Sequence, residues 1–218
     1  LYRYYRCLQN GAFADCFGMT KDSTSCYMLV MRYYEQGDLY EYFEQSTGLL
    51  CWRDIVDMIW SLAVGLNVIH EAGLVHGHIH GGNILVENEA DSIDSRIADN
   101  CLHGPVDNPS KQIYGAIPFV TTELFLMEIR QRKAGSIDTI IADSEICSGL
   151  RPSVIEGTPP IYSKLMLKCL DANLSNRPTA YQLYEGFGDW VSAICDDPNT
   201  SELSDQFDAV DESKFANL

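Results

Sequence analysis

The chain has 218 residues, a size that suits one domain and allows a sizeable hydrophobic core. Its hydrophobic fraction of 46% and charged fraction of 21% are ordinary for a globular protein. The net charge of −16 argues against binding to nucleic acid or anionic lipid, and no apolar run approaches the ~20 residues of a membrane helix.

Cysteine usage and the first residues indicate the compartment. None of the eight cysteines forms a C-x-x-C pair, which argues against a zinc site or a redox motif. The N-terminus has no signal-peptide pattern, so a cytoplasmic location with free thiols is expected.

The first expected elements are two strands, 16–19 and 27–31, on either side of a turn. Asp38 is a good N-cap and opens a short helix. The clearest helix covers 53–71, where apolar residues recur at i, i+3 and i+4, and Gly73 ends it.

The second half of the chain is less regular. The expected elements in chain order are a strand at 83–87, a loop at 99–123, helices at 137–148, 159–170 and 178–194, and an acidic, disordered tail from 196.

One segment carries a chemical motif. Residues 75–86 read V-H-G-H-I-H-G-G-N-I-L-V, and an Ala-Asp pair follows at 98–99. These segments resemble the catalytic loop and the metal-binding loop of protein kinases, H-R-D-L-x-x-x-N and D-F-G. His76, Asn83 and Asp99 stand at the family's His, Asn and metal-binding Asp, whereas His78 stands at the catalytic Asp.

The resemblance extends over roughly 16–195 and is closest to the tyrosine-kinase-like branch. The stretch 27–39 is similar to the strand, hinge and helix that hold adenine, with Met31 at the gatekeeper position. The resemblance implies that the backbone of Arg32, Tyr33 and Tyr34 binds the base, together with Leu85.

Further positions are assigned by the same resemblance. His76 is expected to pack inward, and Glu123 and Arg177 are expected to form a buried ion pair. Ser110 and Tyr114 lie where activation segments are phosphorylated, although Gly77 replaces the Arg that would bind the phosphate.

The implied fold is α+β and protein-kinase-like, with a mostly helical C-terminal lobe and a truncated N-terminal lobe. The expected division is a remnant of the N-terminal lobe at 1–34, the C-terminal lobe at 35–195 with a shortened region after Glu123, and the tail at 196–218.

Parts of the kinase machinery are missing. The sequence has no G-x-G-x-x-G loop, and Lys21 is the only lysine ahead of the hinge, in the expected turn. The region after Glu123 is shorter than in the family, so the central helix of the lobe is compressed.

These features favour a pseudokinase, a signalling and interaction module that binds protein partners. Asn83 and Asp99 could still hold Mg²⁺, which leaves weak binding of ATP open. One alternative is an ATP-dependent Ser/Thr or Tyr kinase whose missing lobe lies outside the chain, and another is a degenerate fragment. The alternation of His76, His78 and His80 also allows a zinc or nickel site.

Overall fold

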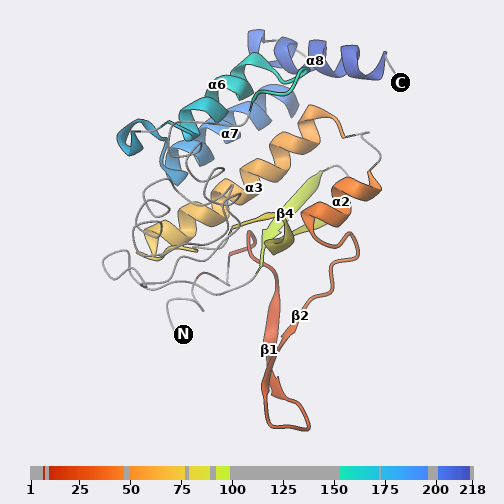
Figure 1. Cartoon of the computed structure of the whole chain (residues 1–218), viewed down its shortest axis with the longest axis vertical. Coiled ribbons are helices and arrows are strands. Elements are labelled where there is room, and N and C mark those ends of the chain that lie inside the picture. Colours follow the sequence, from red (N-terminus) through yellow and green to blue (C-terminus); the bar gives the residue numbers. More distant parts are fainter. Residues whose placement is uncertain are drawn as a thin grey trace, which may run out of the picture.

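In this computed structural model the described residues are 7, 10–46, 50–76, 79–88, 92–98, 153–171, 173–195 and 201–216. Their elements, in chain order, are β1 (Cys16–Lys21), β2 (Tyr27–Met31), α2 (Leu39–Gln45), α3 (Trp52–Glu71), η1 (Gly81–Asn83), β3 (Ile84–Asn88), β4 (Ile93–Ile97), α6 (Pro160–Cys169), η3 (Leu174–Asn176), α7 (Ala180–Cys195) and α8 (Glu202–Phe215) (Figure 1). No helix within these ranges is both long and apolar enough to cross a membrane.

The two strands expected first pair as an antiparallel hairpin, β1–β2, with Lys21 opposite Tyr27 at its tip. The register shifts between Cys16 and Gly18, which places a bulge at the base of the hairpin. The hairpin extends away from the helices and ends far from α8 (Figure 1). Its apolar side chains are largely exposed, with Phe17 at 69% and Tyr27 at 68%.

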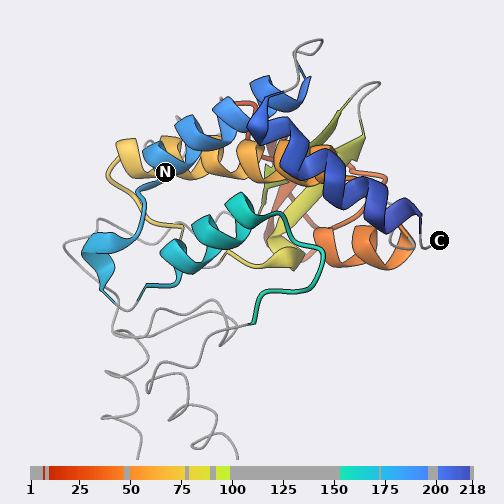
Figure 2. The ribbon, with the colours of Figure 1, turned by 90° about the horizontal axis from the view of Figure 1, so that it is seen from above.

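Helix α3 is the centre of the molecule. It lies between the antiparallel β3–β4 pair on one side and α7 and α8 on the other (Figures 1 and 2). The sequence predicted this helix from its apolar repeat. Strand β4 was not predicted, because it is only five residues long and has a polar residue, Ser95, at a buried position. The Ser95 side chain is fully buried and donates from Oγ to the Met58 carbonyl at 2.6 Å.

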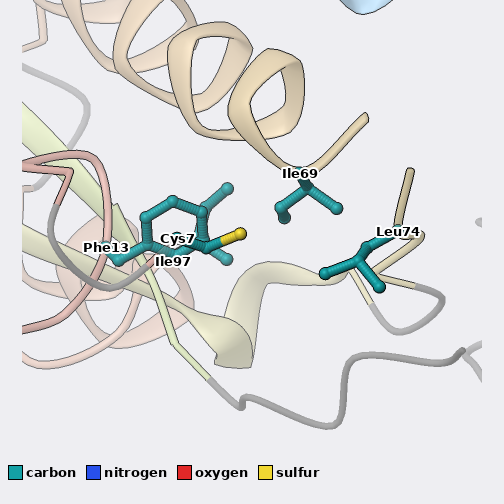
Figure 3. Packing of buried hydrophobic residues seen from close by; sticks show 5 residues of the cluster. All are labelled: Cys7, Phe13, Ile69, Leu74 and Ile97. Atoms are coloured by element: carbon teal, nitrogen blue, oxygen red, sulfur yellow. The ribbon is translucent and has the colours of Figure 1, made fainter. Parts of the chain in front are cut away.

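Two apolar clusters hold α3 from opposite sides. One joins the end of α3 to the N-terminal segment and β4, through Cys7, Phe13, Ile69, Leu74 and Ile97 (Figure 3). The other is aromatic and joins the start of α3 to α7 and α8. Its buried members are Val56, Ala63, Phe187, Trp190 and Phe207. The α+β class expected from the sequence is therefore confirmed.

The prediction of a disordered tail is wrong for residues 201–216. Helix α8 begins at Glu202 and is capped by Ser201, whose side chain accepts from the Ser204 N–H at 3.0 Å. Phe207 is 1% exposed. The acidic composition hid the helix, but Leu203 and Phe207 lie four residues apart on one face and pack in the aromatic cluster.

The burial of Asp57 on α3 should make the stability of the protein depend on pH. Its side chain is 7% exposed, and loss of hydration raises the pKa of the carboxyl above its usual 3.8, an effect that Arg53 opposes only in part. Ionised Asp57 therefore costs stability, a cost that is absent below the ordinary pKa and complete once the pH exceeds the raised pKa. We expect Asp57→Asn to be more stable than the wild type at pH 7.5, and the difference to vanish as the pH falls towards 4.

Thermal melts of both proteins between pH 4 and pH 8 check this expectation. Asp189→Asn is the control, because Asp189 is exposed on α7. A difference for Asp57→Asn that does not change with pH would contradict the assignment.

Candidate functional site

The loop that follows α3 begins with a fixed turn. Gly73 has a φ of +68°, which only glycine adopts readily. Its N–H donates to the His70 carbonyl at 2.9 Å, and the Leu74 N–H donates to the Ile69 carbonyl at 3.1 Å. The helix therefore ends as the sequence predicted, and the chain turns back towards β4.

His76 and Asn83 both hold the backbone of Ala98, which directly precedes the predicted metal ligand Asp99. His76 is 2% exposed, and its Nε2 lies 3.1 Å from the Ala98 carbonyl oxygen. The Ala98 N–H donates to the Asn83 carbonyl at 2.8 Å. Sequence reasoning missed this use of Ala98, since a backbone partner leaves no trace in residue type.

The side chain of Asn83 is turned towards His80. Asn83 is 9% exposed, and its Nδ2 lies 3.0 Å from Nε2 of His80. Nδ1 of the same ring accepts from the Gly82 N–H at 3.1 Å, which caps η1. The imidazole of His80 thus orders the loop that carries Asn83.

Helix α2 lies directly over this loop. Asp38 caps the helix by accepting from the Tyr40 and Glu41 N–H groups, as the sequence predicted, and its backbone bridges Leu85. A Cβ on Gly81 would lie 2.7 Å from the Tyr40 ring, so a larger residue there would require that ring to move.

The predicted hinge residues differ in burial. Tyr33 is 83% exposed, whereas Tyr34 is 7% exposed and forms a buried cluster with Ala14 and Ala98. Met31 and Leu85 pack against this cluster. The structure therefore gathers three of the five residues predicted to bind nucleotide, Met31, Tyr34 and Leu85.

An ion network joins Arg32, in the predicted hinge, to the β3–β4 pair. Arg32 bonds Glu87 on β3, and it also lies 3.5 Å from the Asp15 carboxylate. Arg96 on β4 lies 3.3 Å from Glu87 and 3.2 Å from Asp94. Glu87 is largely buried, so its two arginine partners keep its charge compensated.

Several predicted site residues lie outside the described ranges: His78, Asp99, Ser110, Tyr114 and Glu123. The partner expected for Arg177 is among them. Nε of Arg177 donates to the Asp171 carbonyl at 2.7 Å.

The possible metal site of the three histidines includes His78, which lies outside the described residues, so it stays a prediction. Within the described residues no group of three or more His, Cys, Asp or Glu side chains could hold a metal ion. His76 and His80 each have ring nitrogens engaged in ordering the loop, as described above.

Comparisons with known proteins identify the family of the chain. Residues 5–129 match the model of the protein tyrosine and serine/threonine kinase family. Three probable serine/threonine-protein kinases of Dictyostelium discoideum are similar to the chain. The first is 24% identical over 196 residues, which is 81% of this chain and 14% of that protein.

The other two are roco8, 24% identical over 70% of this chain and 10% of that protein, and pats1, 22% identical over 82% of this chain and 6% of that protein. The chain thus spans a small part of the length of these relatives. Since the family model covers more than half of the chain, the chain belongs to the protein kinase family.

Proposed function

We propose that this kinase-like domain is a pseudokinase, a cytoplasmic signalling module that binds protein partners and does not transfer phosphate efficiently. The observation that carries the proposal is His78 at the position of the catalytic Asp. An imidazole can accept a proton, but it is bulkier than a carboxylate and is placed differently. Loss of a general base typically costs roughly 10²–10⁴-fold in rate.

Weak binding of Mg²⁺ and ATP is part of the proposal. Asn83 and Asp99 would supply the oxygen ligands that Mg²⁺ prefers. Mg²⁺ would bind through Oδ1 of Asn83, whereas the contact of Asn83 with Nε2 of His80, at 3.0 Å, uses Nδ2. Lys21 is at the hairpin tip with its Nζ 4.5 Å from the centre of the Tyr27 ring, and it is not a candidate for binding phosphate.

A protein-binding role is supported by the exposed apolar residues of the hairpin. They are Phe17, Met19, Tyr27, Met28, Leu29 and Val30, between 43% and 69% exposed. Many exposed apolar side chains on one hairpin are typical of interfaces. The same surface favours the second candidate function, an active kinase, if a longer polypeptide supplies the strands that cover it.

The test is transfer of labelled γ-phosphate from ATP by the 218-residue chain, both to itself and to a generic protein substrate. We expect no turnover above that of Asp99→Asn, a variant that removes the predicted metal-binding carboxylate. Turnover that depends on Asp99 would overturn the proposal in favour of an active kinase. A chain without a cooperative melt would instead support the degenerate fragment.

A further inference from the structure

We propose that the side chain of Tyr34 occupies the nucleotide-base site of this domain and closes it. The inference rests on the proposed function for the identity of the site, which is the base site of a kinase-type fold. It goes further, because it names the group that limits nucleotide binding.

The first support is the position of the ring. Tyr34 shares a buried cluster with Ala14 and Ala98, and the two residues packed against the cluster are Met31 and Leu85. Met31 and Leu85 are the side chains that the sequence assigned to the base site. An adenine and a phenol ring are both flat and apolar on their faces, so the same niche cannot hold both.

The second support is that the ring is anchored. The Tyr34 hydroxyl accepts from the Asp15 N–H at 3.0 Å, and the Arg32 guanidinium lies 5.4 Å from the ring centre. Burial raises the pKa of this phenol, so it stays protonated at neutral pH. Moving the ring out would break the bond to Asp15 and expose apolar surface.

The third support comes from the hinge backbone, which was expected to bind the base. The Arg32 N–H donates to the Asp15 carbonyl at 3.0 Å. The Tyr34 carbonyl accepts from the Gly37 N–H at 3.1 Å. Two of the backbone groups that a base would use are therefore engaged within the chain.

If the site is closed, the apparent affinity for nucleotide is the intrinsic affinity multiplied by the fraction of molecules in which the ring has moved out. Removing the ring should remove that penalty without adding any contact to the ligand. Tyr181 offers a matched control, because it has the same side chain, lies on α7 outside the residues assigned to the base site, and is 53% exposed.

The experiment measures binding of mant-ATP with Mg²⁺ to the 218-residue chain by fluorescence anisotropy. We expect Tyr34→Ala to bind the probe about tenfold more tightly than the wild type, or better, and Tyr181→Ala to match the wild type. No gain in a Tyr34→Ala protein that melts cooperatively, or an equal gain in Tyr181→Ala, would overturn the inference.

A second measurement covers the case in which Tyr34→Ala does not fold. The wild-type chain is labelled with 3-fluorotyrosine, and the Tyr34 resonance is assigned with Tyr34→Phe. If mant-ATP shows no saturable binding, we expect the Tyr34 resonance to stay unchanged. If mant-ATP binds, we expect the shift of the Tyr34 resonance to grow in proportion to the bound fraction. Saturable binding with an unchanged Tyr34 resonance would refute the inference. Phosphate transfer is measured in a separate experiment. An active chain would refute the pseudokinase proposal, whereas the closed base site is tested only by the binding and resonance measurements.

Discussion

Replacing Phe207 by alanine is expected to lower the free energy of unfolding by about 3–5 kcal/mol, the usual cost of deleting a buried aromatic ring. Phe207 is 1% exposed. Its ring centre lies 5.7 Å from that of Trp190 on α7 and 6.1 Å from that of Trp52 on α3. The loss leaves a cavity where three helices meet. In a chain of this size it corresponds to a fall in Tm of roughly 6–20 °C.

The matched control is Phe215→Ala in the last turn of the same helix. Phe215 is 42% exposed, so its truncation should change stability by less than about 0.5 kcal/mol. Urea titration of the three proteins gives the comparison. Equal stabilities for Phe207→Ala and the wild type would mean that α8 does not dock on α3 and α7.

Substituting valine for Gly65 is expected to cost about 1–3 kcal/mol, because it overfills a closely packed contact. A Cβ at this position would lie 2.7 Å from Cδ1 of Ile97 and 3.3 Å from Cβ of Ala12. Ile97 is fully buried on β4 and has no solvent to move into. The helix would have to shift away from β4, and the cluster at the end of α3 would lose contacts.

The control is Gly186→Val on α7, which introduces valine into a helix without a steric clash. Nothing lies within 4 Å of a Cβ built at Gly186. Valine and glycine differ by only about 0.3 kcal/mol in helix propensity, so this variant should be near neutral. Thermal melts measure both, and a Gly65→Val protein as stable as Gly186→Val would disprove the close approach of α3 to β4.

The sequence predicted the parts of this fold whose periodicity is strong. The apolar repeat of α3 and its stop at Gly73 required no tertiary information. In contrast, α8 has few apolar residues, and its stability depends on a surface formed by distant helices. A closer search would have found Leu203, Phe207 and Val210 spaced by four and three residues after a serine cap.

The candidate site was also only partly predictable. The kinase motifs predict a catalytic loop and a hinge, because motifs are read from the order of residue types. Motifs do not determine rotamers, so the burial of Tyr34 and the exposure of Tyr33 could not be predicted from two adjacent tyrosines. The link from His76 to Ala98 depends on a carbonyl that any residue type could offer.

The contacts between the start of α3 and α8 also constrain the order in which the protein can fold during synthesis. The Asp211 carboxylate accepts from the Trp52 N–H at 2.9 Å, and Lys214 donates from Nζ to the Leu50 carbonyl at 2.6 Å. These partners are separated by 159 and 164 residues. A nascent chain on the ribosome cannot form these contacts until residues 211–214 have emerged, and contacts of such long range slow folding.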